Sequence, residues 1–207
     1  PKRSHMVAAQ RVLRYIKQTR DVCLKMPNKD SDEGLEMYVD ADHAGCLDTR
    51  RSTSGCIITI GGCAVHWRSK RQSVVAKSTA VAEYISLAEG IEELLWIKNM
   101  LMELGLNSNI QQSNGGDFGQ IPVYEDNIPC IKIAENPLLS QKTKSIDLHY
   151  HIARHSVFNN TIELKYISTD FQMADILTKP LGPKKIEPFQ GTYFQIRRNT
   201  SRGSVKV

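Results

Sequence analysis

Four acidic residues stand out because of their places in the pattern of the chain: Asp40, Glu83, Asp126 and Asp175. Asp40 ends an alternating apolar segment, and Asp126 follows another. Glu83 lies in the first turns of a long helical pattern, and Asp175 opens a short one. From such positions, side chains can meet at one edge of a sheet. Carboxylate oxygens are the ligands that Mg²⁺ prefers, and two such ions, about 3.5–4 Å apart, can stabilise both reacting oxygens of a phosphodiester.

Each of these acids also has a simpler structural explanation. Asp175 could be a first-turn residue favoured by the helix dipole, and Asp126 could be a helix cap. Asp40 could form a turn beside Asp42, and Glu83 could be a solvated helix residue. Spacing alone therefore does not prove that the four carboxylates converge.

Elements that could position the acids follow from periodicity. An amphipathic helix is expected over residues 6–18, followed by strands at 35–40, 56–60 and 63–68. Gly61 and Gly62 between the last two strands are typical of a hairpin. Ser78 and Thr79 could cap a long helix that Gly105 ends.

The second half of the chain alternates between strand and helix patterns. The expected elements are a polar loop at 107–120, a strand at 121–125, a helix after Asn127 with Pro129 in its first turn, a helix at 146–158, a strand at 161–167 and a last short helix at 174–178. The tail after Pro188 has no clear period. Three consecutive strands followed by alternating units predict an α/β fold, a mixed sheet covered by helices.

Composition and charge are those of a globular chain. Of 207 residues, 41% are hydrophobic and 24% charged, which argues against disorder and favours one domain with short flanking pieces. Lys and Arg outnumber Asp and Glu by 27 to 22, a mild excess that suits a polyanionic partner. The five Cys residues form no Cys-x-x-Cys pair, so we expect reduced, buried thiols rather than zinc ligands. No apolar run approaches membrane-spanning length, and no signal-peptide pattern is present.

Several blocks of the sequence resemble the ribonuclease H region of copia-type long-terminal-repeat retrotransposons, in the order of that family. The first block looks like the end of a reverse transcriptase, and the others lie in the ribonuclease H part. The blocks are residues 8–19, 38–45, 49–55, 66–72, 78–84, 123–127, 142–147 and 174–181. Several independent motifs rarely coincide in order, so the resemblance is specific.

The resemblance implies a ribonuclease H-like fold, with a five-stranded mixed sheet whose first three strands are antiparallel. It implies hydrolysis of the RNA strand of RNA–DNA hybrids during reverse transcription, with two Mg²⁺ or Mn²⁺ ions and 3′-hydroxyl and 5′-phosphate products. Asp40 would bridge both ions, Glu83 and Asp126 would complete one shell, and Asp175 would hold the other ion. The implied domains are the end of the reverse transcriptase at 1–30, the ribonuclease H domain at 33–183 and a basic tail at 184–207.

The chain also departs from the family pattern. Val81 stands where a second acid is common, His43 replaces a usual Trp, and Ser145 stands where His is frequent. The loop at 107–120 is longer than usual, and the tail after Phe189 no longer follows the family. These changes indicate a diverged or relic copy.

Basic residues would supply affinity for a hybrid without sequence preference. The candidates are Arg50, Arg51, Arg68, Lys70, Arg71, Lys142, Lys144 and Lys179, each of which could instead be a solvated surface charge. Trp67 and Trp96 are expected in the core rather than stacked on bases. His149, His151 and His155 are expected in packing or surface roles, with proton transfer by His151 as a further hypothesis.

The expected partners are an RNA–DNA hybrid and the reverse transcriptase domain of the same polyprotein, with no membrane involved. The expected location is a cytoplasmic virus-like particle or the nucleus, and not outside the cell. Two other functions stay open on the sequence. The chain could bind nucleic acid without cutting it, or it could be a structural relic that supports a reverse transcriptase. Four intact acids favour the enzyme, because a pure binder has no reason to keep a costly cluster of like charges.

Overall fold

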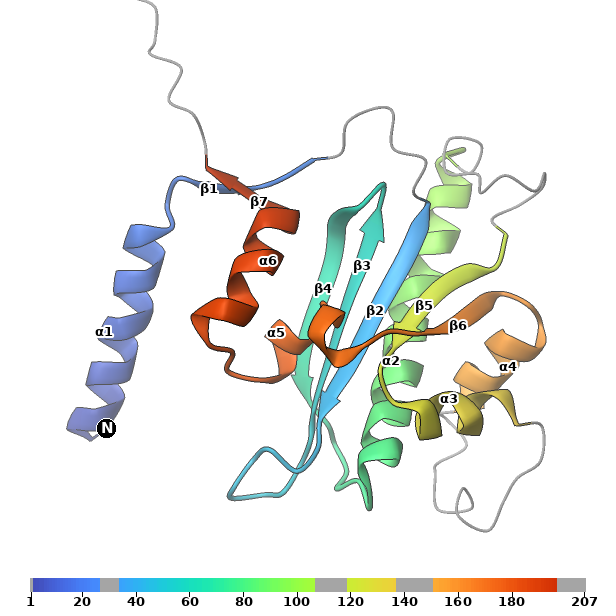
Figure 1. Cartoon of the computed structure of the whole chain (residues 1–207), viewed down its shortest axis with the longest axis horizontal. Helices are drawn as coiled ribbons and strands as arrows, with labels where there is room; N and C mark the ends of the chain where they lie inside the picture. The colour runs from blue at the N-terminus through green and yellow to red at the C-terminus, as the bar shows by residue number, and fades with distance from the viewer. Residues whose placement is uncertain (1, 27–33, 107–118, 137–150, 197–207) are drawn as a thin grey trace, which may run out of the picture.

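The computed structural model describes residues 2–26, 34–106, 119–136 and 151–196. At its centre is a five-stranded sheet in the order β4-β3-β2-β5-β6 (Figure 1). The strands are β2 (Leu35–Asp42), β3 (Thr53–Ile60), β4 (Cys63–Arg71), β5 (Ile121–Glu125) and β6 (Ile162–Tyr166).

The directions of the strands confirm the expected mixed sheet. β2 and β3 are antiparallel, as are β3 and β4, whereas β5 runs parallel to β2, and β6 runs parallel to β5. β2 is longer than predicted, because its pairing with β3 continues to Asp42 opposite Thr53. Parallel neighbours end at the same edge of a sheet, so the last residues of β2 and β5 lie at one edge.

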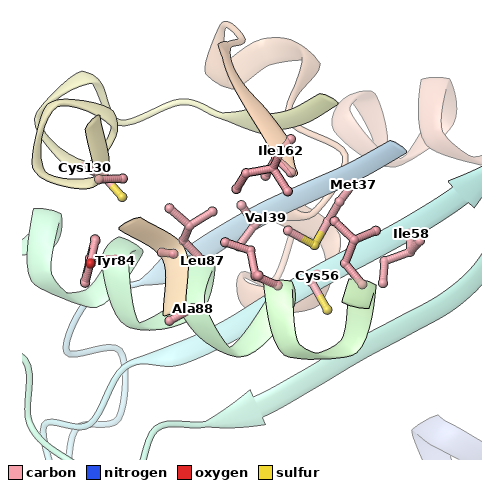
Figure 2. Close-up of a cluster of buried hydrophobic side chains, with 14 of the residues drawn as sticks. Met37, Val39, Cys56, Ile58, Tyr84, Leu87, Ala88, Cys130 and Ile162 are labelled. Atoms are coloured by element: carbon pink, nitrogen blue, oxygen red, sulfur yellow. The ribbon is translucent and has the colours of Figure 1, made fainter. Parts of the chain in front are cut away.

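One face of the sheet is covered by the long helix α2 (Thr79–Glu103). Ser78 caps it as expected, accepting a hydrogen bond from the Val81 amide. Figure 2 shows the core between α2 and the strands, in which Met37, Val39 and Leu87 are fully buried. Helices α3 (Ile128–Glu135) and α4 (Ile152–Phe158) pack against α2 and against each other.

The short helix α5 (Asp175–Thr178) packs against β2, β3 and β4. Gly55 permits this close approach, because a Cβ atom there would lie 2.6 Å from Cγ2 of Thr178 and 3.2 Å from the Ala174 carbonyl oxygen. A 3₁₀ turn, η3 (Thr169–Phe171), precedes α5. The pattern at 174–178 therefore does form a helix, and β3 provides the space for it.

The structure corrects the expectation that this helix is the last one. A further helix, α6 (Pro183–Tyr193), and a strand, β7 (Phe194–Ile196), follow it. Strand β7 pairs antiparallel with β1 (Val22–Leu24), which the sequence pattern did not indicate either. These elements escaped prediction because they form through long-range pairing and through contacts of Phe189 with Tyr193 and Phe194, rather than through a regular apolar repeat.

Helix α1 (Arg3–Gln18) contains the predicted amphipathic segment, but none of its residues is buried. Its apolar side chains, among them Leu13 and Ile16, are more than half exposed. The helix lies at the periphery of the molecule, beside α6 (Figure 1). An open apolar groove of about 840 Å³ is lined by residues of α1, α6 and the sheet, including Tyr15, Ile57 and Phe189.

Both tryptophans contradict their predicted place in the core. Trp67 is 52% exposed and Trp96 is 61% exposed. Trp67 is opposite Ile57 in the β3–β4 pair and lines the apolar groove. Strand β4 lies at the edge of the sheet, so an aromatic side chain on this strand can remain exposed to solvent.

Three of the five cysteines are buried, as the sequence predicted. Cys56, Cys63 and Cys130 are buried, Cys23 and Cys46 are half-buried, and none of the five forms a disulfide. Most of the loop at 107–120 and the first part of the helix expected at 146–158 lie outside the described residues. Within the described ranges, no helix combines the length and apolar character needed to cross a membrane.

Candidate metal centre

Three of the four predicted acids meet at the edge of the sheet. Asp40, Glu83 and Asp126 each present a carboxylate oxygen, and these oxygens lie within 4.8 Å of one another. Asp40 comes from β2, Glu83 from the second turn of α2, and Asp126 directly follows β5. An all-oxygen donor set of this kind suits a hard divalent cation such as Mg²⁺ or Mn²⁺.

Asp40 is held from several sides. Its side chain is completely buried, its Oδ2 accepts a hydrogen bond from Oγ1 of Thr178, and its backbone carbonyl accepts one from Oγ of Ser86 at 2.7 Å. Burial raises the pKa of Asp40 above its ordinary value, although the hydrogen bond from Thr178 and the charge of Lys179 oppose this effect. The carboxylate is therefore fixed in place.

Glu83 carries the strongest evidence that the cluster needs a cation. Its side chain is buried, and among the described residues its Oε2 has no hydrogen-bond partner. Burial, together with the charges of Glu125 and Asp40, raises the pKa of Glu83 to about 10. This oxygen could coordinate a divalent ion, which would also supply the missing positive charge. The residues present therefore fit the metal that the resemblance implies.

Asp175 lies beside Asp40 but is not part of the group of three. The two carboxylates are connected by Lys179, whose Nζ lies 2.8 Å from Oδ1 of Asp175 and 3.2 Å from Oδ1 of Asp40. Lys185 also approaches Asp175, at 3.5 Å from Oδ2. Although burial opposes its charge, the hydrogen bond to Asp175 and the attraction of Asp40 raise the pKa of Lys179. The predicted acids thus form a group of three and an ion-paired fourth.

Two polar side chains, those of Gln172 and Thr169, hold the acids in place. Neither residue stood out in the sequence. Nε2 of the buried Gln172 donates to the carbonyl oxygens of Val39 at 3.0 Å and Tyr124 at 3.3 Å, and so joins the ends of β2 and β5. Oγ1 of Thr169 donates to Oδ2 of Asp126 at 2.7 Å. No local sequence signal marks either role, since both contacts join distant parts of the chain.

A fifth acid, Glu125, is buried next to the cluster. Its Oε1 accepts a hydrogen bond from the Asn127 amide at 3.0 Å, whereas its Oε2 has no partner within the described part of the chain. Burial raises its pKa well above the ordinary value, and Asp126 adds to this effect. The sequence contained a signal here, because Glu125 has the same parity in β5 as the buried residues Ile121 and Val123.

The basic candidates have different surroundings. Arg50, Arg51, Lys70 and Arg71 are exposed. Lys70 and Arg71 pair with residues 53–54 of β3, which in turn pair with the last residues of β2. Nη1 of Arg68 instead lies 2.8 Å from Oε1 of Glu93, within an ion pair. Lys179 pairs with the acids as described above. Lys142 and Lys144 lie outside the described residues.

The histidines occupy other surroundings. His43 contacts the Ala76 carbonyl oxygen through Nε2 at 3.2 Å, and His151 precedes α4 and contacts Arg154. His155 is exposed on α4. His149 and Ser145 lie outside the described residues. Proton transfer by His151 stays a hypothesis.

Transposon polyproteins are among the known proteins to which this chain is similar. No family model matches the chain. It is 37% identical over 187 residues to the retrovirus-related Pol polyprotein from transposon TNT 1-94 of Nicotiana tabacum, covering 90% of this chain and 13% of the relative. It is also 37% identical over 208 residues to the Pol polyprotein from transposon RE2 of Arabidopsis thaliana, covering 99% of this chain and 13% of that relative. The chain therefore spans only a small part of the length of the curated relatives it matches.

Solved structures of ribonucleases H are similar to the described fold. LC11-RNase H1, determined in complex with an RNA/DNA hybrid, has 14% sequence identity and a TM-score of 0.46, covering 70% of this chain and 93% of that one. The order and directions of the strands define the described part of the chain as an α/β domain built on a five-stranded mixed sheet. Over most of its length, the chain is homologous to retrovirus-related Pol polyproteins of copia-type transposons, at 35–37% identity.

Proposed function

We propose that this chain is a metal-dependent ribonuclease H that hydrolyses the RNA strand of RNA–DNA hybrids during reverse transcription of a retrotransposon. The observation that carries the proposal is the convergence of Asp40, Glu83 and Asp126, with a buried Glu83 oxygen that lacks a partner among the described residues. A cluster of buried like charges is costly without a cation. Its retention in the fold therefore supports a metal-binding role.

The roles that we assign to the residues follow from their positions. Glu83, Asp126 and Asp40 would hold one Mg²⁺ or Mn²⁺ ion, and Asp40 and Asp175 would hold a second. When bound, such ions polarise a phosphoryl oxygen and lower the pKa of bound water. Thr178 and Gln172 would keep Asp40 and the strand ends in place, so the carboxylates need not reorganise when a substrate arrives.

The proposed substrate carries a negative charge at every phosphate. Exposed Lys70 and Arg71 pair with residues 53–54, which in turn pair with the last residues of β2, and exposed Arg50 and Arg51 precede residues 53–54 in the chain. Positive charge at this edge would attract the backbones of both strands without reading their sequence. The 2′-hydroxyl groups of the RNA strand would then distinguish it from DNA.

The test is cleavage of a labelled RNA–DNA hybrid in the presence of Mg²⁺ or Mn²⁺. We expect cleavage by the unmodified chain and its loss in Asp126→Asn, which keeps the shape of the side chain but removes the ligand charge. Asp170→Asn is the matched control, since Asp170 is exposed on η3 and should leave cleavage unchanged. Hybrid binding without cleavage by the unmodified chain would contradict the proposal and support the nucleic-acid-binding alternative.

The proposed partner in the polyprotein is its reverse transcriptase, with which the chain would share a virus-like particle or the nucleus. The chain matches 13% of its Pol relatives, and α1, which lies in the segment expected to end the reverse transcriptase, carries an exposed apolar stripe that the rest of that domain could cover. We expect Leu13→Asp in a longer polyprotein fragment to weaken the packing of α1 against the reverse transcriptase, measured by limited proteolysis. Unchanged protection would contradict this partner surface.

A further inference from the structure

Lys179 occupies the space between the two carboxylates that would hold the second ion. Its Nζ lies 2.8 Å from Oδ1 of Asp175 and 3.2 Å from Oδ1 of Asp40. The side chains of Asp40 and Asp175 are 0% and 4% exposed, whereas that of Lys179 is 33% exposed. A single ammonium group thus neutralises a nearly buried pair of carboxylates from the partly open side.

Asp40 therefore lies between two groups of side chains that differ in charge. Toward Glu83 and Asp126, the cluster consists of carboxylates, and within the described part of the chain neither of these two acids forms an ion pair with Lys or Arg. Toward Asp175, a cation of the chain itself is already in place. One half of the site therefore lacks a cation, and the other half has one.

We propose that Lys179 is a tethered cation that neutralises the Asp40–Asp175 pair until a second divalent ion displaces it. The inference rests on the proposed function, because it assumes that these acids are metal ligands. The lysine and the ion would compete for the same two oxygens, Oδ1 of Asp40 and Oδ1 of Asp175, since two cations cannot occupy one position. The first ion would bind beside Glu83 without such competition, so the two ions bind with unequal affinity.

The local structure allows Lys179 to leave without moving α5. The residue follows the last residue of α5, and its backbone N–H donates to the Asp175 carbonyl oxygen at 3.0 Å, which fixes the main chain. The side chain is a flexible four-carbon stem with a strongly hydrated head group. Rotation of this stem would carry the ammonium group from the carboxylates to the solvent.

Lys185 provides a matched comparison. Its Nζ lies 3.5 Å from Oδ2 of Asp175, its side chain is 46% exposed, and among the described residues it forms an ion pair with Asp175 alone. Removing either lysine deletes one positive charge near the same carboxylate. Of these two lysines, Lys179 alone lies between the two acids. An effect of displacing the lysine should therefore appear only when Lys179 is replaced, whereas a general change in electrostatic potential should appear with either substitution.

The experiment is a titration with Mn²⁺ alone, without nucleic acid, in which free Mn²⁺ is counted by electron paramagnetic resonance. It compares the unmodified chain with Lys179→Met and Lys185→Met. We expect Lys179→Met to bind the weaker ion roughly ten-fold more tightly, since a partly buried competing ion pair is removed. Lys185→Met should change the affinity for this ion by less than about three-fold. The melting temperature in EDTA should fall for Lys179→Met, because the carboxylates lose their counter-ion.

Two results would overturn the inference while leaving the proposed function intact. One is a Lys179→Met chain that binds two ions with unchanged affinities, and the other is an equal effect of both substitutions. If Lys179→Met does not fold, Lys179→Arg keeps the competing charge and should bind the weaker ion no more tightly than the unmodified chain. Tighter binding by Lys179→Arg would contradict displacement. Absence of Mn²⁺ binding in every chain would overturn the proposed function together with the inference.

Discussion

At the scale of single residues, the acids of the site differ in how their charge is balanced. Asp40 and Asp175 share the ammonium group of Lys179, and Asp40 also accepts a hydrogen bond from Thr178. Glu83 has no such partner for Oε2 among the described residues, and its pKa is raised to about 10 by burial and by neighbouring carboxylates. Stability without metal should therefore depend on pH mainly through the part of the cluster that lacks a cation.

The raised pKa of Glu83 predicts how the free energy of unfolding of the metal-free chain changes with pH. A carboxyl group whose pKa is higher in the folded than in the unfolded chain stabilises the fold by binding a proton. That contribution is complete below the unfolded value of 4.5 and is lost as the pH rises toward the folded value of about 10. In EDTA, the free energy of unfolding should decrease between pH 5 and pH 9, as measured by urea denaturation.

Replacement of Glu83 isolates its share of this effect. Glu83→Gln removes the titrating group, so the metal-free chain should gain about 1–2 kcal/mol at pH 9 and show a weaker pH dependence. Glu103→Gln is the control, because Glu103 is an exposed residue near the end of the same helix. Equal pH dependence in the chain with Gln at position 83 and in the unmodified chain would show that Glu83 is not the responsible group.

At the scale of elements, the site depends on how β2, β5 and α5 meet. Gln172 joins the two strands through the carbonyl oxygens of Val39 and Tyr124, directly before Asp40 and Glu125. Gly55 in β3 leaves room for α5, which carries Asp175 and Thr178. Neither residue belongs to the group of acids, but both determine where the acids lie.

Gln172→Leu should destabilise the chain without changing its hydrophobic core. The substitution leaves the Val39 and Tyr124 carbonyl oxygens without their side-chain donor, a loss of about 1–3 kcal/mol that urea denaturation would measure. The affinity for Mn²⁺ should fall as well, because the strand ends that carry Asp40 and Asp126 lose their connection. Unchanged stability would mean that other groups or water replace the donor.

Gly55→Ala should displace α5, because the new methyl group would lie 2.6 Å from Cγ2 of Thr178 and 3.0 Å from Cβ of Leu177. We expect a loss of roughly 1–3 kcal/mol together with weaker Mn²⁺ binding at the Asp175 side. Gly182→Ala is the control, since nothing lies within 4 Å of a Cβ atom at that position. Similar effects of the two substitutions would contradict the steric explanation.

At the scale of the whole molecule, stability is concentrated between α2 and the sheet. Leu87 on α2 is fully buried, whereas Leu13 on α1 is 66% exposed. The apolar groove beside α1 adds exposed apolar surface at the periphery. The periphery and the core should therefore respond differently to the same change of side chain.

Leu87→Ala should cost about 2–5 kcal/mol in the free energy of unfolding, as expected for a cavity in a close-packed core. Leu13→Ala should cost less than about 0.5 kcal/mol, because the side chain is already largely in solvent. Thermal denaturation of the two variants gives the comparison. A large loss for Leu13→Ala would contradict the exposed position of this side chain.

The sequence by itself determined the local elements and the candidate acids. Alternating apolar residues predicted β2 and β6, and short apolar segments predicted β3, β4 and β5. Ser78 and Asn127 predicted the starts of α2 and α3, and Gly61 with Gly62 predicted the hairpin. These features depend on neighbours a few positions away, which periodicity and capping describe well. The resemblance to the copia-type family added the expected sheet and the roles of the acids.

Only the tertiary structure decided which charges meet. Lys179 and Asp40 are 139 positions apart, and Gln172 and Val39 are 133 apart, so no local pattern could reveal that they touch. Lys179, which we predicted to contact nucleic acid, lies between two carboxylates, and two tryptophans that we expected in the core are exposed. The physical reason is that burial and pairing are properties of the packed chain, whereas sequence patterns report only the preferences of short segments.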